Sequence, residues 1–281
     1  MARTRAAAAD SPAPSANSAP VLTVEHLAKA YGGVQAVDGV SFSVEAGALV
    51  ALIGPNGAGK TTTFNIINGQ IKPDTGRVLL EGEDVTGLAS RELSRRGVGR
   101  TFQITATFAS MTVAENVRVA LATDKRELGM FHSAADAHAA EAMDLLALVG
   151  IQEQAERTCG LLAYGDLKRV ELAMALANKP RLLLMDEPTA GMAPRERGEL
   201  MALAARLAQQ RGVAVLFTEH DMNVVFAHAT RILVMNRGKL IAQGAPDAVR
   251  RDPLVREVYL GQGDTIAAGR SPPAAARATD G

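Results

Sequence analysis

The sequence predicts an α/β fold with an inserted helical subdomain, and three observations support this prediction. Short apolar runs rich in β-branched residues alternate with helical segments through much of the chain, as they do where strands and helices follow one another. One of these apolar runs leads directly into a glycine-rich turn. A polar, alanine-rich stretch over 112–154 is typical of helix throughout, and it separates two portions of the alternating kind.

Each expected strand is a short apolar run bounded by turn residues. In the first portion the runs lie at 21–27, 40–44, 48–53 and 76–85, the last being a strand followed by a turn. The helical stretch starts with TVAE, in which Thr112 and Glu115 have the spacing of a capping box. After Pro180, a strand is expected at 181–185, and further strand and helix units follow at 212–217, 221–229 and 231–235.

The composition is that of an ordinary globular chain. Of 281 residues 47% are apolar, and the 30 basic residues balance the 30 acidic ones, so a strongly basic groove for nucleic acid is not expected. No apolar run approaches the roughly 18 residues that cross a bilayer. The single cysteine, Cys159, excludes an intramolecular disulfide, fits a reducing compartment and is expected to be a packed side chain. The ends, 1–20 and 264–281, are expected to be disordered tails around a folded part at 21–263.

A nucleotide-binding loop is indicated by GPNGAGKT, which matches G-x-x-x-x-G-K-[ST] between an expected strand and a helix. Glycines let backbone N–H groups turn toward phosphate oxygens, and the start of a helix favours an anion. Lys60 supplies a cation for the β- and γ-phosphates, and the Thr61 hydroxyl can bind Mg²⁺. A helix-entry turn with a chance lysine and threonine is the disfavoured alternative. The candidate nucleotide-binding residues are Gly54, Pro55, Asn56, Gly57, Ala58, Gly59, Lys60, Thr61 and Thr62.

A pair of acids follows the expected strand in LLLMDEP. Asp186 ends the strand beside the expected Mg²⁺ position, which is the role of the second acidic motif in P-loop NTPases. Glu187 comes next and points elsewhere, so it can act as general base for an attacking water. The alternative is that the two acids merely mark the solvent-exposed end of a strand. The presence of the phosphate loop makes this alternative less favoured.

Four further motifs stand in order around the phosphate loop and the acid pair. They are KAYGG with Tyr31, GRTFQ with Gln103, LAYGD at 162–166 and TEHDM with His220. With this arrangement the chain resembles the ATP-binding subunits of ABC transporters over essentially the whole of 21–263. The resemblance implies a P-loop NTPase (ABC ATPase) core with an antiparallel β subdomain and an inserted helical subdomain at about 104–177.

The resemblance also implies a role for each matched residue. Tyr31 would stack on the adenine of ATP, although a tyrosine in a turn at a strand end is the ordinary alternative. Gln103 would reach Mg²⁺ and the attacking water and would sense a membrane partner. His220 would contact the γ-phosphate, although a solitary histidine is more often structural or merely exposed.

LAYGD stands where this family carries its signature motif, and Ala163, Tyr164, Gly165 and Asp166 are the candidate residues. In the family two such domains pair head to tail, so the signature of one chain covers ATP held by the other. It would supply backbone N–H groups and a helix N-terminus to the γ-phosphate. One face of this helix is expected to carry Leu167, Val170, Met174 and Ala177, with Lys168, Arg169 and Glu171 elsewhere.

Three residues depart from the family pattern. Ala163 replaces a serine whose hydroxyl would bind phosphate, Asp166 replaces a neutral glutamine, and Ala193 stands where many members carry an acid that links the two sites. Lys60, Glu187 and His220 are all present. An active ATPase with a weaker signature half-site is therefore expected.

The branch of the family is indicated by several motifs together, RTFQ, MTVAENV, LAYG, EPTAGMAP, TEHDM and VYLG. They are similar to the ATPases of branched-chain amino-acid uptake systems. That resemblance implies ATP and Mg²⁺ as cofactors, a second identical or different ATPase chain, membrane permease subunits and, indirectly, an extracytoplasmic solute-binding protein. It also implies a peripheral position on the cytoplasmic face of the inner membrane.

Docking of a permease helix is expected at Ile104, Phe108 and Met111, with ordinary subdomain packing as the alternative. Import of urea or short amides and export of lipopolysaccharide remain open as related functions. A soluble ABC ATPase of translation or DNA repair is disfavoured by the single phosphate loop and the lack of heptads. A nucleotide-binding regulator without hydrolysis would be favoured only if Glu187 were dispensable.

Overall fold

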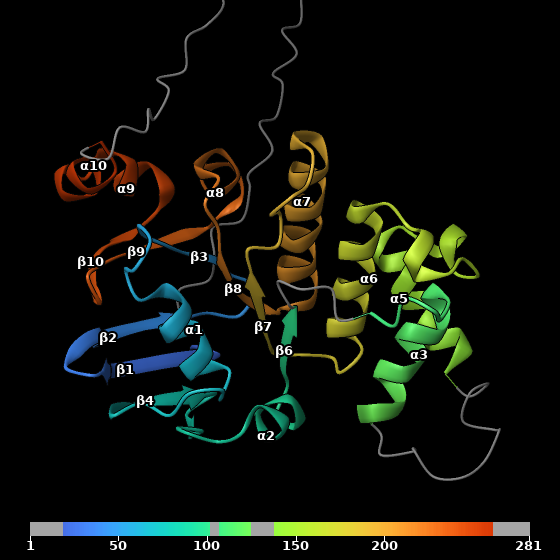
Figure 1. Ribbon diagram of the computed structural model, residues 1–281, viewed down its shortest axis with the longest axis horizontal. Coiled ribbons are helices and arrows are strands. Elements are labelled where there is room, and N and C mark those ends of the chain that lie inside the picture. Colours follow the sequence, from blue (N-terminus) through green and yellow to red (C-terminus); the bar gives the residue numbers. More distant parts are fainter. Residues whose placement is uncertain (1–18, 102–106, 125–137, 261–281) are drawn as a thin grey trace, which may run out of the picture.

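Two sheets of different kind organise the molecule (Figure 1), whose computed structural model describes residues 19–101, 107–124 and 138–260. The four-stranded sheet has the order β2-β1-β4-β5 and is antiparallel. Its strands are β1 Leu22–Tyr31, β2 Val34–Val44, β4 Thr75–Leu80 and β5 Glu83–Asp84. The six-stranded sheet has the order β10-β9-β3-β8-β7-β6. Its strands are β3 Leu49–Ile53, β6 Val98–Thr101, β7 Leu182–Asp186, β8 Ala214–Thr218, β9 Arg231–Asn236 and β10 Lys239–Gly244.

The six-stranded sheet is parallel except for β10, which pairs antiparallel with β9. Its central strands are buried on both faces. Along β3, for example, Leu49, Ala51 and Ile53 belong to one apolar cluster, whereas Val50 and Leu52 belong to the other. Burial on both faces explains why these strands are continuous apolar runs without alternation in the sequence.

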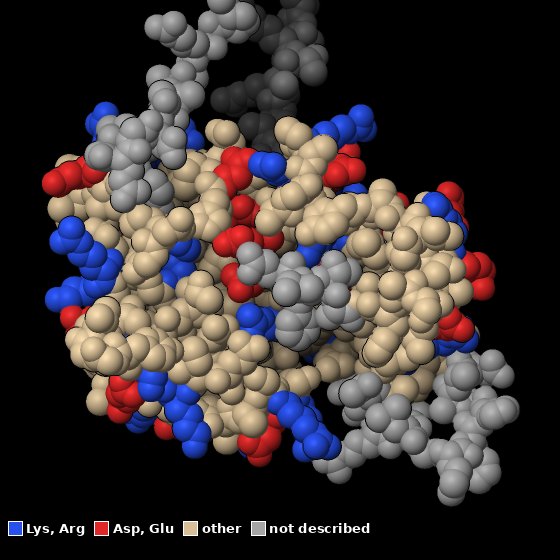
Figure 2. All heavy atoms as spheres, in the orientation of Figure 1, with Lys and Arg blue, Asp and Glu red and all other residues tan. Residues whose placement is uncertain are grey.

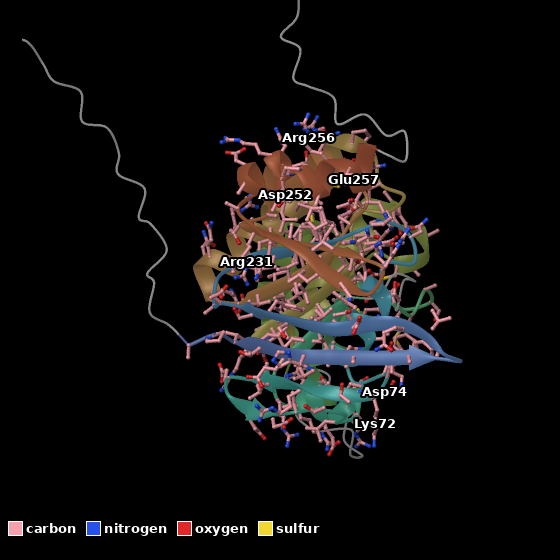
Figure 3. The ribbon with its side chains drawn as sticks, turned by 90° about the vertical axis from the view of Figure 1, so that its left-hand side faces the viewer. Lys72, Asp74, Arg231, Asp252, Arg256 and Glu257 are labelled. Atoms are coloured by element: carbon pink, nitrogen blue, oxygen red, sulfur yellow. The ribbon has the colours of Figure 1, made fainter. Side chains whose placement is uncertain are left out.

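The helices occupy three regions of the molecule. The element order gives α1 Lys60–Ile67, α2 Ser90–Arg95, α3 Val113–Asp124, α5 Ala139–Val149, α6 Tyr164–Leu176, α7 Pro194–Arg211, α8 Met222–His228, α9 Pro246–Arg251 and α10 Pro253–Leu260. Figure 1 shows α3, α5 and α6 together on one side of β6 and β7. Figure 3 shows α9 and α10, around Asp252 and Arg256, at the opposite end of the molecule from Lys72 and Asp74 beside the antiparallel sheet.

Two apolar clusters hold these layers together. One joins one face of the six-stranded sheet to α7 and to the helices α3, α5 and α6. The other joins the opposite face to α1 and to the antiparallel sheet. In the part of the chain that the structure describes, no helix has both the length and the apolar character that spanning a membrane requires.

The predicted α/β fold with an antiparallel β subdomain is confirmed, and the predicted strands are present with shifted ends. The capping box is also confirmed, because the Glu115 N–H donates to Thr112 Oγ1 at 3.2 Å and the Thr112 N–H donates to Glu115 Oε2 at 2.7 Å. The stretch 112–154 is not wholly helical. Gly150 ends α5 with φ of 75°, which is the left-handed cap that glycine favours, and a 3₁₀ turn follows at Gln152–Gln154.

The expected faces of α6 require a correction. Lys168 and Glu171, placed away from the buried face, are each only 5% exposed, whereas Leu167 and Met174 are only partly buried. Lys168 Nζ donates to Glu171 Oε2 at 2.9 Å. Two charged residues one turn apart can be buried as a pair, and helical periodicity counts charged residues as exposed.

The expected domain limits stay predictions. The described residues begin at 19 and end at 260, so the tails fall almost entirely outside them, as does 125–137 within the expected helical stretch. The elements without a counterpart among the predicted ones are β6, β10, α2, α7, α9 and α10.

Candidate functional site

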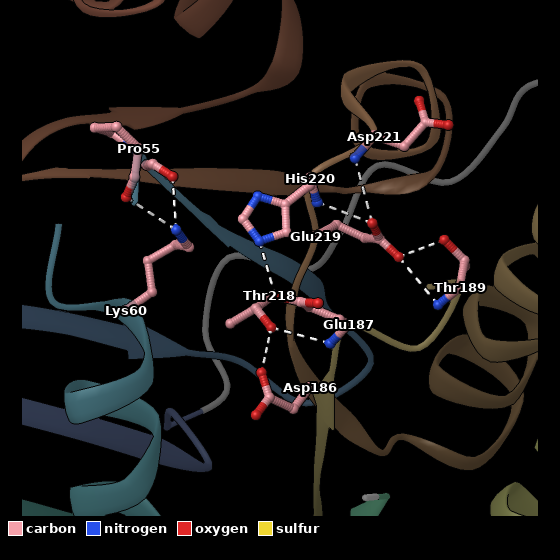
Figure 4. A network of polar contacts seen from close by, with 10 residues as sticks. Pro55, Lys60, Asp186, Glu187, Thr189, Thr218, Glu219, His220 and Asp221 are labelled. Carbon is pink, nitrogen blue, oxygen red and sulfur yellow. Dashed lines mark hydrogen bonds and ion pairs between the residues drawn. The ribbon is translucent and has the colours of Figure 1, made fainter. Parts of the chain in front are cut away.

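The phosphate loop, the acid pair and His220 meet at one edge of the six-stranded sheet. The phosphate loop follows β3, Asp186 ends β7, and His220 follows β8 after Thr218. Because these strands are parallel, their carboxyl ends lie at the same edge, which is where ligands bind in open α/β sheets. Figure 4 shows the polar contacts that join these segments.

The phosphate loop is shaped by glycines and anchored to neighbouring strands. Gly57 and Gly59 have φ of 78° and 100°, in the region that glycine adopts without strain. At Gly59 a Cβ would lie 2.3 Å from the carbonyl oxygen of Ala36, so no other residue fits. The carbonyl of Ala58 accepts from the Gly238 N–H at 3.0 Å, which fixes the loop to the turn between β9 and β10.

Lys60 begins α1, and its ammonium group is held inside the loop. Nζ donates to the carbonyl oxygen of Gly54 at 2.6 Å and to that of Pro55 at 3.1 Å. Burial lowers the pKa of Lys60 from its ordinary value, and the nearby charges of Glu187 and Asp186 act in the opposite direction. An anion at the start of α1 would therefore meet a cation, a helix N-terminus and the N–H groups of the loop.

The remaining loop residues differ in exposure. Asn56 and Gly57 are exposed, and so is Thr61, whereas Thr62 is partly buried. Thr63, one residue further along α1, is fully buried and donates to Met235 Sδ at 3.7 Å. Of these three threonines Thr61 is the most exposed, which fits the predicted role of its hydroxyl at the loop.

The two acids of the pair point in different directions, as expected. Asp186 Oδ1 accepts from Thr218 Oγ1 at 2.6 Å, and Oδ2 lies 3.6 Å from the guanidinium of Arg100. Glu187 has φ of 46°, a left-handed conformation that costs a non-glycine residue about 1–2 kcal/mol. Its N–H donates to Thr218, to the carbonyl oxygen at 3.2 Å and to Oγ1 at 3.0 Å. The turn away from the strand brings Glu187 Oε1 to 2.8 Å from His220 Nε2.

A buried carboxylate beside His220 escaped the sequence analysis. Glu219 is 5% exposed and accepts from the N–H groups of His220 at 2.9 Å and Asp221 at 3.3 Å. It also accepts from the N–H of Thr189 at 3.0 Å and from the hydroxyl of the same residue. Thr218 and Glu219 thus connect the segment of the acid pair with the segment of His220 (Figure 4). Both residues lie within TEHDM, but the motif does not show which distant groups they contact.

The signature residues lie apart from this cluster. Figure 1 shows α6 well away from α1, on the other side of β7. Ala163 is the N-cap of α6 and provides no side-chain hydrogen bond, while Asp166 lies in the first turn. A Cβ on Gly165 would lie 3.2 Å from Cδ of Glu196 in α7, so the glycine makes room for a carboxylate of its own chain. Tyr164 is partly exposed and lies against Gly191.

The other predicted residues are less fully placed. Tyr31 ends β1 and is exposed, with Lys29 Nζ 5.7 Å from the centroid of its ring. Gln103 and Ile104 lie outside the described residues. Phe108 is exposed, and its N–H donates to Asn116 Oδ1 at 2.7 Å, while Met111 is partly buried.

Charge is unevenly distributed over the face that Figure 2 presents. Asp and Glu side chains gather in the middle of this face, whereas Lys and Arg lie mostly around its rim. The chain as a whole is balanced, with a formal net charge of zero. Acidic side chains grouped in this way create a local negative potential, which favours a bound cation.

Family models and relatives were compared with this chain. A model described as "ABC transporter" matches residues 37–190, and one described as "Branched-chain amino acid ATP-binding cassette transporter" matches residues 239–265. The chain is 41% identical over 256 residues to the high-affinity branched-chain amino acid transport ATP-binding protein BraF of Pseudomonas aeruginosa, with 87% of this chain and 99% of the relative covered. It is 39% identical to LivG of Escherichia coli K12, with the same coverage. It is 34% identical to the lipopolysaccharide export system ATP-binding protein LptB of Haemophilus influenzae, with 86% and 98% covered.

Solved structures give the same kind of match. A nucleotide-free ATP-binding cassette from an ABC transporter superposes with a TM-score of 0.76 at 31% identity, covering 86% of this chain and 99% of that one. A cassette in its ADP conformation also gives 0.76 at 31% identity, with 87% and 100% covered. A dimeric post-hydrolysis cassette bound to ADP and phosphate gives 0.67 at 27% identity, with 80% and 98% covered.

Proposed function

The chain belongs to the ATP-binding proteins of ABC transporters, and on that premise we propose that it drives an importer of branched-chain amino acids. It is an ATPase whose hydrolysis is coupled to transport. The match to the branched-chain amino-acid model at 239–265 and the names of BraF and LivG support the choice of solute. The observation that carries the proposal for the site is the contact between Glu187 and His220, 2.8 Å long, at the sheet edge that also holds the phosphate loop.

Each residue of the site has a chemical task in this proposal. Lys60 leaves the loop carbonyls and binds the β- and γ-phosphates, together with the N–H groups of 54–61. Glu187 accepts the proton of the attacking water, and His220 holds the γ-phosphate next to it. Tyr31 stacks on the adenine, for which its exposed position at the end of β1 is suited.

We assign Mg²⁺ binding to Asp186 and Thr61, with Gln103 as the third protein group. Carboxylate and hydroxyl oxygens suit Mg²⁺, which is usually held by one or two carboxylates together with substrate phosphates. Support comes from the fixed Asp186 carboxylate, the exposed Thr61 and the acidic centre of the face in Figure 2. The metal would supply charge neutralisation to the phosphates.

A second ATPase chain, identical or different, completes the proposed assembly. The signature residues Ala163, Tyr164, Gly165 and Asp166 would close over the nucleotide of that partner, and the dimeric cassette among the similar structures supports such pairing. Permease subunits would hold the pair at the cytoplasmic face of the inner membrane, with an extracytoplasmic solute-binding protein acting through them.

Docking of the permease is assigned to the exposed Phe108 and its neighbours Ile104 and Met111. In a reconstituted transporter, Phe108→Asp should abolish ATP-driven uptake while the ATPase activity of the separate chain is kept. Leu254→Asp is the matched control, because Leu254 is also an exposed apolar residue but lies in the C-terminal helix α10. Undiminished uptake with Phe108→Asp would contradict docking at this place.

Glu187→Gln tests the proposed reaction directly. The variant keeps the shape of the side chain but removes the base, so we expect ATP turnover to fall by about 100-fold or more while ATP binding persists. Turnover at the wild-type rate would show that Glu187 is not the base. Uptake of radiolabelled leucine by the assembled transporter tests the solute. ATP-driven lipopolysaccharide movement instead would favour the export function suggested by the relative LptB.

A further inference from the structure

We propose that Arg197 is a positioning residue for His220, an inference that rests on the function proposed above. Arg197 lies in the first turn of α7 and reaches two segments of the site. One is the segment 190–193, which follows the acid pair. The other is the His220 loop, defined here as residues 219–221 between β8 and α8. These two segments are not joined by strand pairing or by a common helix. Side chains therefore hold them in place relative to each other.

The two contacts of Arg197 use different nitrogens of its guanidinium group. Nε donates to the carbonyl oxygen of Met192 at 2.7 Å, and the terminal nitrogen Nη1 donates to Asp221 Oδ2 at 2.8 Å. The guanidinium is planar and rigid, so these two bonds fix the distance between Met192 and Asp221. Both side chains of the ion pair are partly buried, which limits screening by solvent.

Asp221 cannot move freely at its end of this connection. Its other carboxylate oxygen, Oδ1, caps α8 by accepting from the N–H groups of Asn223 at 3.0 Å and Val224 at 3.4 Å. One oxygen therefore holds the start of a helix, and the other holds Arg197. A shift of the His220 loop would have to break one of these sets of bonds.

On the other side of His220 the loop has a second attachment. Glu219 accepts from the backbone N–H groups of His220 and Asp221 and also from Thr189, just before the segment 190–193. The imidazole of His220 is half exposed, so its direction toward Glu187 depends on this backbone. Arg197 and Glu219 together make the two sides of that support.

The same turn of α7 also touches the signature residues. Glu196, next to Arg197, lies beside Gly165, and Tyr164 lies against Gly191 within the segment 190–193. A displacement at the start of α6 would thus be transmitted through α7 to Asp221 and His220. Ala193 has no carboxylate that could link the two nucleotide sites of paired chains. Arg197 instead connects the start of α7 with the His220 loop within one chain.

An ordinary surface ion pair would contribute little to stability and nothing to the reaction. Arg197→Met separates the two possibilities, because methionine keeps the length of the side chain and loses both hydrogen bonds. With the full-length chain, ATP and Mg²⁺, we expect kcat to fall about tenfold, as small misplacements of reacting groups do. The KM for ATP should change less than about twofold, since Arg197 contacts no part of the phosphate loop. Arg197→Lys should recover part of the loss.

Arg195→Met is the matched control. Arg195 lies two residues earlier in the same helix, its side chain is 91% exposed, and it pairs with Glu199. Its kcat should equal that of the wild type. Thermal unfolding of each variant shows whether the fold is kept. If Arg197→Met unfolds at a clearly lower temperature than the wild type, Arg197→Lys takes its place in the comparison.

A double-variant cycle decides whether Arg197 acts through His220. In a His220→Ala background, Arg197→Met should have no further effect on kcat, because the group that it positions is gone. Additive losses would overturn the proposal, and so would an unchanged kcat of Arg197→Met. In the latter case, loss of ATP turnover in Glu187→Gln would still leave the proposed function intact. A wild-type chain that does not hydrolyse ATP would overturn both.

Discussion

The edge of the six-stranded sheet and the start of α6 are constructed in opposite ways. At the sheet edge the charged groups already have partners within the chain. Lys60 donates to a carbonyl oxygen of its own loop, and Glu187 contacts His220. At the start of α6 the cap position is Ala163, which offers no hydrogen bond, and the next residue, Tyr164, is partly exposed. The first region contains the groups that we propose to react, and the second is built around a helix N-terminus.

This contrast separates two requirements of one reaction. Reactive groups need fixed distances and partners, which a sheet edge with neighbouring parallel strands supplies. A helix start that receives an anion from elsewhere needs open N–H groups, and internal partners would block them. The following four predictions alter one region at a time.

The largest effect is expected at the sheet edge. Lys60→Met should lower ATP affinity by about 100-fold or more, since the only loop cation is lost. The fold should be kept, because burial already disfavours the charge, as its lowered pKa indicates. Titration with a fluorescent ATP analogue measures the affinity. Lys239→Met, at an exposed lysine paired with Asp38, is the control and should bind ATP normally. Equal affinity of the two variants would refute the role of Lys60.

The next effect concerns the start of α6. Gly165→Ala should reduce turnover by about tenfold, because its Cβ would lie 3.2 Å from Cδ of Glu196, so that either this carboxylate or the helix start has to shift by a few tenths of an ångström. ATP binding at the phosphate loop should not change. The control is Gly198→Ala in α7, where a Cβ has nothing within 4 Å, and alanine there should stabilise the chain by about 0.5–1 kcal/mol. Loss of ATP binding in Gly165→Ala would mean that the two regions are not separate.

A smaller gain is expected from Ala163→Ser. Serine at the N-cap should stabilise the chain by about 1 kcal/mol, since its hydroxyl accepts from an N–H group of the first turn. The same hydroxyl could serve a phosphate, so turnover should rise a few-fold over the wild type. Thermal unfolding and an ATPase assay measure the two effects independently. A serine variant with slower turnover would count against a weakened signature half-site.

The smallest effect concerns Cys159, which lies in the 3₁₀ turn Cys159–Leu161 just before α6. Its side chain is fully buried, Asn116 Nδ2 donates to its Sγ at 3.3 Å, and burial raises the pKa of the thiol. Since the thiolate reacts, labelling by a thiol reagent at neutral pH should be slow and should increase only at more alkaline pH. The unfolded chain should react at once. Rapid labelling of the native chain would show that the base of α6 opens readily.

Motifs with local chemistry were predictable from the sequence. The phosphate loop, the acid pair and the histidine after β8 were identified because each belongs to a motif of consecutive residues. Such motifs can be recognised without knowing which distant residues they contact. The central strands of the parallel sheet were equally predictable, since burial on both faces makes them uninterrupted apolar runs. The helix α7 also left a signal, because Leu200, Leu203, Ala204, Leu207 and Ala208 recur on one face and are buried.

Contacts between distant residues were not predictable. Arg197 belongs to no motif, and Thr218 and Glu219 had no predicted role within TEHDM; the importance of all three comes from partners that lie elsewhere in the chain. The buried pair Lys168 and Glu171 misled the analysis of α6, because a periodicity argument treats every charge as solvent-exposed. The strand β6, with the sequence VGRT, is too short and too polar to be recognised without its neighbour β7.

The order of strands in the parallel sheet has a consequence for biosynthesis. The strand β3, which carries the phosphate loop, lies between β8 and β9, and both of these come from residues after 213. During translation at about 5–20 residues per second, the loop emerges roughly 10 to 30 s before its two neighbours. Throughout that interval β3 has two unpaired apolar edges, which are prone to aggregate. We therefore expect nascent chains that stop before β8 to bind chaperones strongly, and those that extend past β9 to be released.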